Sequence, residues 1–192
     1  CRGLLAQGHK VSSFQRHYST ELERLGVKQI LGVLNDKSQV FEALIGQDAV
    51  LHNAAKASGW GAWHDFYQTN VIGTQNIIEG CLQLDIQKLV YTSTPSVVHQ
   101  GHTAVAGGNE INTPYARHFS AYYPHTKKIA EQAVLAANSI QLATVALRPR
   151  LIWGPGDTQL LPRLIERSKA GRLRFIGGGD NKMDCTYIDN VV

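Results

Sequence analysis

The sequence has no block of like charge and very little cysteine. Its 192 residues include 19 basic and 15 acidic side chains. These are scattered, so the net charge of +4 is typical of a solvated, mildly basic surface and not of a nucleic-acid-binding arm. Cys1, Cys81 and Cys185 are too widely spaced for a zinc site or a disulfide framework. We therefore predict no metal site, no nucleic-acid partner and a reducing, cytoplasmic setting.

Long hydrophobic runs are also missing. No uninterrupted apolar run reaches about 18 residues, so no membrane span is predicted. The share of hydrophobic residues, 43%, suits a globular domain with a sizeable core. The chain begins with Cys1 in place of methionine and stops at Val192. We interpret it as a segment of a longer protein.

Short β-rich runs alternate with helical patterns along the chain. Several of these runs are apolar on both faces, as in a sheet that helices cover on both sides. The alternation predicts an α/β fold with a doubly wound parallel sheet. In such sheets, ligands bind at the carboxyl ends of the strands. Strands are expected at 10–14, 29–34, 49–55, 88–94, 143–149 and 173–177, and helices at 20–25, 37–45, 65–84, 124–138 and 159–170.

The segment SAYYPHTKK, at 120–128, contains a tyrosine followed four positions later by a lysine. In a helix, Tyr123 and Lys127 would share one face. A free phenol has a pKa near ~10, and a nearby ammonium lowers it, which would suit acid–base catalysis. Spacing alone favours a solvated surface pair. Pro124 places Tyr123 at the start of the helix and makes the convergence of the pair less certain.

The strand in LVYTSTPSV, at 89–97, ends in three hydroxyl residues, Thr92, Ser93 and Thr94. A hydroxyl at this position would either orient a substrate carbonyl or satisfy local backbone groups, and the sequence does not separate these readings. At the end of the preceding predicted strand, Ala54 and Ala55 are small enough to admit a flat ligand. Asn70 near a helix start is either a cap, which is the favoured reading, or a polar relay.

These motifs resemble those of the extended short-chain dehydrogenase/reductase family, and they occur in the family's order. They are NAA at 53–55, NVIGTQN at 70–76, TST at 92–94, YPHTK at 123–127, LRPRLIWGPGD at 147–157 and DCTYIDNV at 184–191. YTSTPSVV, YPHTK and TYIDNV are most similar to the 3β-hydroxysteroid and sterol dehydrogenase group. The longer run from AAKASGWG to VALRPRLIWGPGD is similar to bacterial 2-alkyl-3-oxoalkanoate reductases. The resemblance implies a Rossmann-like fold that is incomplete at both ends.

The resemblance also implies a role for each matching residue. Tyr123 corresponds to the general acid/base, and Lys127 to the residue that lowers its pKa and binds the nicotinamide ribose. Thr94 corresponds to the hydroxyl that positions the substrate carbonyl, and Asn70 to a proton relay through water. The cofactor positions that it implies are Arg16, Leu34, Asn53, Ala54, Ala55, Lys56, Thr92, Tyr123, Lys127 and Pro149.

The expected cofactor form depends on the end of the first predicted strand. Dinucleotide folds that prefer NAD place an acid at the corresponding position, whereas an arginine suits a 2′-phosphate. The segment KVSSFQRH has no acid there, and Arg16 and His17 stand in its place. NADP(H) is therefore preferred, with NAD(H) as the alternative. Asp36 is a candidate contact to adenine, because the family's usual Gly-Asp-Leu is replaced by Gly-Val-Leu at 32–34.

The glycine fingerprint G-x-x-G-x-x-G and the first strand are absent. We expect 1–192 to be one dinucleotide-binding segment without them, with most of the substrate domain after Val192. Four aromatic residues at 60–67 either line an apolar pocket or form core: Trp60, Trp63, Phe66 and Tyr67. With TPSVV, the pocket reading favours a lipid-like ketone or alcohol, either a 3-oxoacyl acid or a 3-hydroxysteroid or sterol.

The predicted function is an NADP(H)-dependent oxidoreductase that interconverts such a ketone and its secondary alcohol. Pro95 after Thr94 counts against sugar-nucleotide dehydration, where the superfamily has Asp-Glu. A nucleotide-sugar epimerase shares the Tyr/Lys pair and is the first alternative. A non-catalytic dinucleotide-sensing protein is the second. The expected partners are a small apolar substrate and a second copy of the chain in a homodimer.

Overall fold

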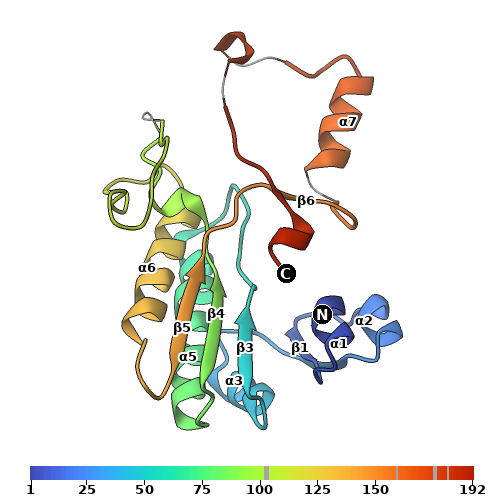
Figure 1. Ribbon diagram of the computed structural model, residues 1–192, viewed down its shortest axis with the longest axis vertical. Coiled ribbons are helices and arrows are strands. Elements are labelled where there is room, and N and C mark those ends of the chain that lie inside the picture. The colour runs from blue at the N-terminus through green and yellow to red at the C-terminus, as the bar shows by residue number, and fades with distance from the viewer. Residues whose placement is uncertain (102–103, 159, 175–176, 181) are drawn as a thin grey trace. The chain divides into compact units, whose positions relative to one another are not determined.

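A computed structural model describes residues 1–192 apart from 102–103, 159, 175–176 and 181. The chain forms two compact units, Cys1–Arg148 and Pro149–Val192. Figure 1 shows the elements of each unit.

The first unit is built on parallel strands, as the sequence predicts. One sheet pairs β1 with β2, and a second has the order β3-β4-β5. This unit confirms the α/β class, and its five strands fall inside the ranges expected for them or extend past them by one residue. The strands are β1 (Ser12–Gln15), β2 (Lys28–Leu31), β3 (Ala49–His52), β4 (Lys88–Thr92) and β5 (Ala143–Leu147).

Helices connect these strands. They are α1 (Arg2–Ala6), α2 (Thr20–Arg24), α3 (Lys37–Leu44), α4 (Trp63–Phe66), α5 (Gly73–Gln83) and α6 (Tyr122–Ala136). The helix expected over 65–84 is not one regular α-helix. A π-helical segment, η1 (Tyr67–Ile72), separates α4 from α5. A short 3-10 turn, η2 (Pro95–Val97), follows β4.

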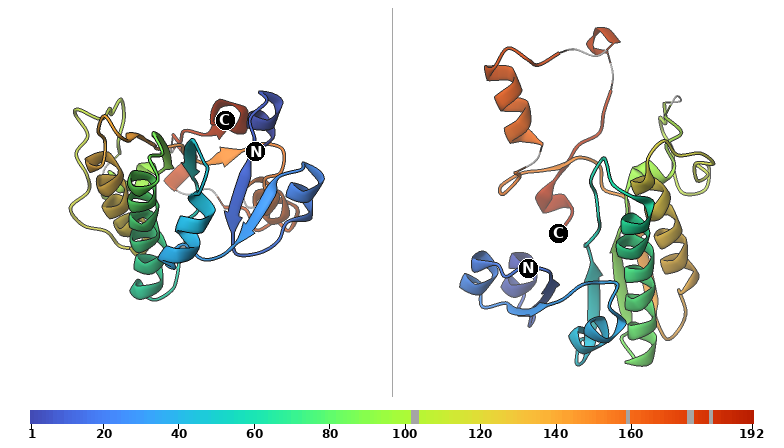
Figure 2. Two further views of the ribbon diagram at one scale, coloured as in Figure 1. Left: turned by 90° about the horizontal axis from the view of Figure 1, so that it is seen from below. Right: turned by 180° about the vertical axis from the view of Figure 1, so that it is seen from behind.

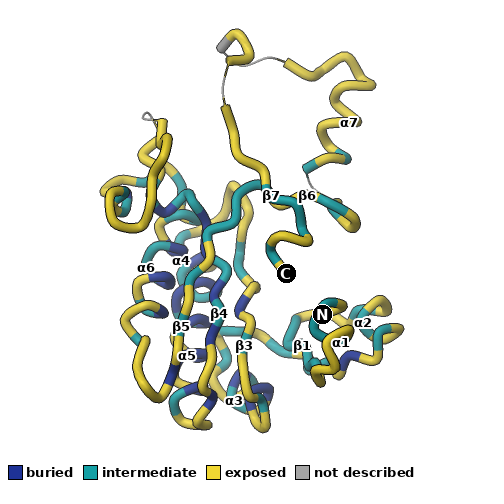
Figure 3. Tube along the Cα trace, viewed as in Figure 1, coloured by how far each residue is buried: buried dark blue, intermediate teal, exposed yellow. Residues whose placement is uncertain are grey.

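The core lies between the three-stranded sheet and the helices on one of its faces. Figures 1 and 2 show α5 and α6 side by side against β4 and β5. The buried residues of Figure 3 gather there, including Leu89 and Tyr91 of β4. On α6 the buried positions recur at helical spacing and include two charged residues, Lys127 and Glu131. Charges are rarely buried unless they are paired, so α6 carries more than packing residues.

The opposite face of this sheet has exposed apolar side chains. Leu51 of β3 and Val145 of β5 both lie beside Val90 of β4 in the register, so they share one face. The exposed fractions of Leu51 and Val145 are 49% and 43%, and Leu147 on the same strand is also exposed. Helix coverage of this face is therefore lower than the prediction of two covered faces implies.

The second unit is small. Its elements are β6 (Ile152–Trp153), α7 (Leu161–Lys169), η3 (Gly177–Gly179), β7 (Thr186–Tyr187) and η4 (Ile188–Asn190). The strands β6 and β7 pair in parallel, and the rings of Trp153 and Tyr187 lie 5.0 Å apart. The strand expected at 173–177 is not found at Leu173 or Arg174, and Gly177 begins η3; 175–176 lie outside the described residues. Neither β6 nor β7 was predicted.

Candidate active site

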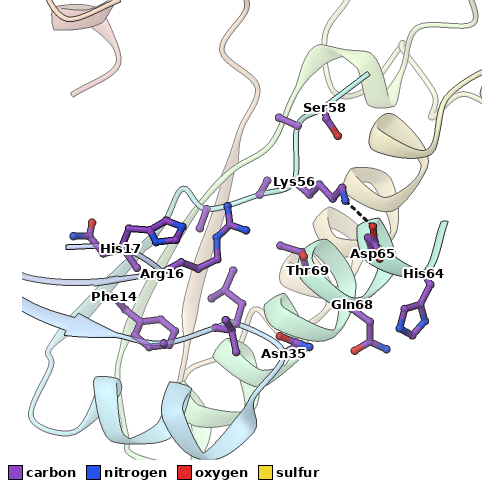
Figure 4. Close-up of a pocket in the computed structure, with 17 residues that line it drawn as sticks. Phe14, Arg16, His17, Asn35, Lys56, Ser58, His64, Asp65, Gln68 and Thr69 are labelled. Carbon is purple, nitrogen blue, oxygen red and sulfur yellow. Dashed lines mark hydrogen bonds and ion pairs between the residues drawn. The ribbon is translucent and has the colours of Figure 1, made fainter. Parts of the chain in front are cut away.

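A pocket of about 870 Å³ opens at the carboxyl ends of β1, β2 and β3, all in the first unit (Figure 4). This is the edge at which a parallel sheet binds its ligands. Five of the predicted cofactor positions line it: Arg16, Leu34, Ala54, Ala55 and Lys56. The remaining lining residues are Phe14, Gln15, His17, Gly32, Val33, Asn35, Ala57, Ser58, His64, Asp65, Gln68 and Thr69.

Arg16 is the cation that follows β1. Figure 4 shows its side chain extending from the end of the strand into the pocket, beside His17. Arg16 is exposed, and within the part of the chain that the structure describes its guanidinium has no hydrogen-bond or ion-pair partner. It is therefore available to an anionic ligand.

Lys56 and Asp65 lie on another side of the pocket. Lys56 Nζ and Asp65 Oδ2 are 2.8 Å apart and form an ion pair. This lysine holds the pKa of the Asp65 carboxyl below its usual value. The only lining carboxylate among the described residues thus already has a cationic partner.

Asn70 is in the middle of η1 and is not a helix cap, so the favoured cap reading is wrong. Its Oδ1 accepts from the Lys56 backbone N–H at 2.7 Å, and its Nδ2 donates to the Lys56 carbonyl at 3.1 Å. Nδ2 also donates to Thr126 Oγ1 at 3.0 Å. Asn70 therefore joins the loop after β3 to the first turn of α6. π-helical segments are frequent at functional sites.

The rest of the NVIGTQN motif holds the neighbouring strand ends. A Cβ atom at Gly73 would lie 2.6 Å from the Leu34 Cβ, so only glycine lets α5 approach the loop after β2 this closely. Asn76 Nδ2 donates to the Leu34 carbonyl at 2.8 Å. Thr74 Oγ1 lies 2.9 Å from His52 Nε2, at the end of β3. Burial lowers the pKa of His52 to about 3, so its imidazole is neutral.

The hydroxyl residues after β4 each have a separate partner. Thr92 Oγ1 donates to Asn53 Oδ1 at 2.5 Å, which ties the ends of β3 and β4 together. The Thr94 side chain is buried; its hydroxyl donates to Ser96 Oγ at 3.2 Å and also lowers the pKa of the Tyr123 phenol. The strand end therefore presents one hydroxyl beside the predicted proton donor.

Pro124 does not prevent Tyr123 and Lys127 from sharing a helix. The helix α6 begins at Tyr122, and Pro124 lies in its first turn, where backbone N–H groups have no helical acceptor. Tyr123 and Lys127 are therefore four residues apart on one regular helix. Tyr122 turns elsewhere: its ring meets that of Trp63 edge-on, with centroids 5.5 Å apart.

Lys127 contacts the strand end and not the phenol. Its Nζ donates to the Thr92 carbonyl at 2.7 Å and lies 4.0 Å from the centroid of the Tyr91 ring. The predicted lowering of the Tyr123 pKa by Lys127 does not occur in this structure. Burial raises the pKa of Tyr123, and the Thr94 hydroxyl partly opposes it. Burial lowers the pKa of Lys127 to about 7, with the Glu131 carboxylate acting in the other direction.

Four predicted positions lie away from the pocket lining. These positions lie at the ends of β3 and β4 and at the start of α6: Asn53, Thr92, Tyr123 and Lys127. Among them, Thr92 contacts both Asn53 and Lys127. Pro149 is in the second unit.

The structure also bears on the predictions for Asp36 and for the four aromatic residues at 60–67. Asp36 caps α3, accepting from the Gln39 backbone N–H at 3.1 Å, and is not part of the pocket lining. Phe66 is a core residue with an exposed fraction of 2%, whereas Trp60 is 92% exposed. Trp63 and Tyr67 are half-buried, with ring centroids 5.7 Å apart.

Glu131 and Arg148 were not among the site residues predicted from the sequence. Glu131 is 1% exposed and accepts from Arg148 Nη2 at 2.5 Å. The signal was present: Glu131 stands four residues after Lys127 and so falls on the same helix face. Among the residues that the structure describes, no group of acidic, histidine and cysteine side chains could hold a metal ion. No helix in that part of the chain has the length and apolar character needed to cross a membrane.

Comparison with known proteins identifies the relatives of this chain. The sequence model of the 3-beta hydroxysteroid dehydrogenase/isomerase family matches residues 10–192. A 2-alkyl-3-oxoalkanoate reductase of Stenotrophomonas maltophilia is 56% identical over 190 residues, which are 99% of this chain and 58% of that protein. Sterol-4-alpha-carboxylate 3-dehydrogenase, decarboxylating, of Homo sapiens is 38% identical over 192 residues, covering 98% of this chain and 50% of that protein.

The fold is also shared with solved structures. The crystal structure of Thermus thermophilus UDP-glucose 4-epimerase in complex with NAD has a TM-score of 0.73 and 26% identity, covering 88% of this chain and 58% of that chain. The chain spans 58% and 50% of the lengths of the two curated relatives. These matches confirm the resemblance to extended short-chain dehydrogenases/reductases. The chain belongs to the 3-beta hydroxysteroid dehydrogenase/isomerase family.

Proposed function

We propose that the protein is an NADP(H)-dependent oxidoreductase that interconverts a ketone and a secondary alcohol on a lipid-like substrate. The observation that carries this proposal is the buried Thr94 hydroxyl beside the Tyr123 phenol, whose pKa it lowers, with Lys127 on the same face of α6. A phenol and a second hydroxyl that lie beside each other can both reach one carbonyl oxygen. The curated relatives are named as a reductase and a dehydrogenase.

The pocket fits a dinucleotide. Ala54 and Ala55 leave room for a flat ring, and Gly32 would place a Cβ atom 2.5 Å from the Phe14 ring, so the backbone is close-packed there. Arg16 offers at the rim a guanidinium that no other described residue pairs with. We propose that Arg16, Leu34, Ala54, Ala55 and Lys56 hold the adenosine half of the cofactor. Asn53 and Thr92 are proposed to contact its other half.

The chemistry follows from the positions of the side chains. When bound, the nicotinamide supplies or accepts the hydride. In the reduction, Tyr123 donates its phenolic proton to the carbonyl oxygen, and Thr94 donates a hydrogen bond to that oxygen and orients it. Lys127 Nζ lies on the Thr92 carbonyl in this structure, so in this proposal the ammonium turns toward Tyr123, stabilises the resulting phenolate and returns a proton to it. Lys127 then regains a proton from solvent through water held by Asn70, which is bound to Lys56 and Thr126.

The preference for NADP(H) rests on Arg16. A guanidinium presents two parallel N–H donors that match a phosphate group. Its hydrogen bonds to the charged phosphate are stronger than its hydrogen bonds to a ribose hydroxyl. The lining carboxylate, Asp65, already has Lys56 as its partner. It is therefore a poor acceptor for the ribose hydroxyls that mark an NAD site.

The names of the two curated relatives share one chemical feature, which we propose for this substrate. In a 2-alkyl-3-oxoalkanoate, the keto carbon is separated from the carboxylate by one substituted carbon. In a sterol-4α-carboxylate, the C3 oxygen has the same relation to the carboxylate on C4. The proposed substrate class is therefore a β-oxo or β-hydroxy acid with apolar substituents on the intervening carbon.

The test uses the full-length protein with NADPH. A long-chain 2-alkyl-3-oxo acid should be reduced, seen as loss of NADPH absorbance, and a 3-oxosteroid without a carboxylate should react more slowly. Equal rates would remove the β-oxo acid proposal. Conversion of UDP-glucose to its 4-epimer would favour the epimerase. NADPH binding without turnover of any ketone would favour the dinucleotide sensor.

We also propose that chain outside residues 1–192 completes the sheet. A doubly wound sheet places its first strand between the second and the fourth. Here no strand among the described residues joins the two-stranded sheet β1-β2 to the three-stranded sheet β3-β4-β5. The exposed Leu51, Val145 and Leu147 would be covered by the same additional chain. The proposal predicts a G-x-x-G-x-x-G segment upstream of Cys1 in the gene. Sedimentation of the full-length protein checks the proposed homodimer.

A further inference from the structure

Glu131 is a buried carboxylate on α6 that collects hydrogen bonds from three different segments. Its Oε2 accepts from the Ser93 hydroxyl, directly after β4. Its Oε1 accepts from the Tyr115 hydroxyl at 2.7 Å, in the loop before α6. Arg148, directly after β5, donates to both oxygens through Nε, at 3.1 and 3.2 Å, and to Oε1 through Nη2.

Such a set of donors is what a buried charge requires. An unpaired buried carboxylate costs several kcal/mol, and removing one partner of a buried pair costs about 3–5 kcal/mol. Arg148 and the hydroxyls of Ser93 and Tyr115 lower the pKa of Glu131 against the effect of burial, so it stays ionised. Packing alone would be served equally well by an apolar residue at this position.

The contact with Ser93 links Glu131 to the proposed reaction centre. Ser93 stands between Thr92, whose carbonyl accepts from Lys127 Nζ, and Thr94, whose hydroxyl meets Tyr123. The Ser93 backbone N–H also donates to the Leu147 carbonyl at 2.6 Å. Hydrogen bonds therefore hold both the side chain and the backbone N–H of Ser93. These bonds in turn fix the directions of the neighbouring Thr92 carbonyl and Thr94 side chain.

Glu131 also faces Lys127, one helical turn before it. Both side chains are buried on α6, and the carboxylate favours the charged form of the lysine. The other titratable groups around Lys127 are His52 on β3, Tyr91 on β4 and Tyr123 on α6. His52 is neutral, and neither phenol is acidic. Tyr115 and Arg148 face Glu131 from the loop before α6 and from the end of β5.

We propose that Glu131 is a positioning residue for the active site. Through Ser93 it fixes the strand end that presents the Thr92 carbonyl and the Thr94 hydroxyl, and it is the counter-charge of Lys127. The proposal rests on the function proposed above, because it assigns reaction roles to Thr94, Tyr123 and Lys127.

The experiment compares variants that separate charge from geometry in the full-length protein. Glu131→Gln removes the charge and keeps the shape. Its kcat with NADPH and a 2-alkyl-3-oxo acid should fall at least about tenfold, as expected for a lost charged hydrogen bond. The loss of activity at high pH should also begin at lower pH, because Lys127 deprotonates earlier. Glu131→Asp keeps the charge, so its kcat should fall while that limb of the pH profile stays in place.

Ser93→Ala and Tyr115→Phe are the matched pair for geometry. Each deletes one hydroxyl that donates to Glu131, but only Ser93 belongs to the strand end. Ser93→Ala should lower kcat about tenfold with little change in KM for NADPH, whereas Tyr115→Phe should stay within about twofold of the wild type. Equal effects in both variants would reduce Glu131 to a structural ion-pair partner and overturn the proposal.

A second readout does not depend on any ketone. The titration of the Lys127 side chain, followed by NMR and assigned with Lys127→Arg, should shift downward in Glu131→Gln by about one unit. An unchanged midpoint would overturn the counter-charge role. If the wild type reduces no ketone, the proposed function fails, and this titration still decides whether Glu131 governs Lys127. If Glu131→Gln does not fold, as judged by circular dichroism, Glu131→Asp and the Ser93/Tyr115 pair still decide the geometric role.

Discussion

Lys127 donates its hydrogen bond to the Thr92 carbonyl, at 2.7 Å, and not to Tyr123, which precedes it by one helical turn. The lysine therefore belongs to the strand end as much as to the helix. Its ammonium is held beside β4 before any ligand arrives, and burial, partly opposed by the Glu131 carboxylate, lowers its pKa to about 7. The phenol, by contrast, is kept protonated by burial, which is the state required of a proton donor.

Replacing the phenol tests the proton donor. Tyr123→Phe should lower kcat by about 10²–10⁴-fold, the usual contribution of a general acid, because it removes only the hydroxyl. NADPH affinity, measured by fluorescence titration, should change little. Tyr122→Phe is the control: this ring contacts Trp63, so its hydroxyl should be dispensable. Turnover that survives in Tyr123→Phe would end the assigned mechanism.

Reversing the charge at the pocket rim tests the cofactor preference. Arg16→Glu should raise the Kd for NADPH about tenfold or more, because a carboxylate would replace the phosphate's partner. The Kd for NADH should change less than about threefold. Arg24→Glu, at the exposed end of α2 and outside the pocket lining, makes the same charge change elsewhere. An equal loss for both cofactors in Arg16→Glu would contradict the preference.

The buried imidazole makes stability depend on pH. The pKa of His52 is about 3 in the folded protein, because burial disfavours the cation, and near ~6.5 when unfolded. Between these values the unfolded chain binds the additional proton. The free energy of unfolding should therefore decrease as pH falls below about 6.5, by up to about 1.4 kcal/mol per pH unit from this group.

Urea unfolding at pH 7 and pH 5 measures this dependence. His52→Gln should show a smaller decrease between the two values than the wild type. His9→Gln, at an exposed histidine, should retain the full decrease. The same slope in all three proteins would mean that His52 does not titrate as its burial implies.

A single methyl group tests the contact between α5 and the pocket. Gly73→Ala places a Cβ atom 2.6 Å from Leu34, so α5 or the loop after β2 must move. Overpacking of this kind costs about 1–3 kcal/mol of stability, and NADPH affinity should fall with it because Leu34 lines the pocket. Gly59→Ala meets no atom within 4 Å and is the control. Thermal unfolding with and without NADPH gives both quantities.

The sequence predicted the five strands of the first unit and the edge at which the site lies, because both depend on periodicity and on the chirality of parallel sheets. Arg16, Ala54 and Ala55 were found by the same rule, since each follows a strand. Family resemblance supplied the roles of Tyr123 and Thr94, and the structure adds that the Thr94 hydroxyl lies close enough to affect the pKa of the phenol.

Features that depend on exact backbone geometry were beyond the sequence. The π-helical turn at Asn70 adds one residue to a continuous helical pattern, and a hydrophobic period does not register this change. The partner of Lys127 is a backbone carbonyl, which every residue has, so no side chain announced it. Glu131 and Arg148 are 17 residues apart and meet only because β5 returns beside α6.

The NVIGTQN segment has a consequence for how this protein can change. Four of its positions, Asn70, Gly73, Thr74 and Asn76, hold the loops after β2 and β3 and the end of β3 itself. A helix turns by about 100° per residue. One inserted or deleted residue here would rotate the later contacts away from the sheet together, whereas most substitutions would affect one loop. The segment should therefore tolerate changes of identity far better than changes of length.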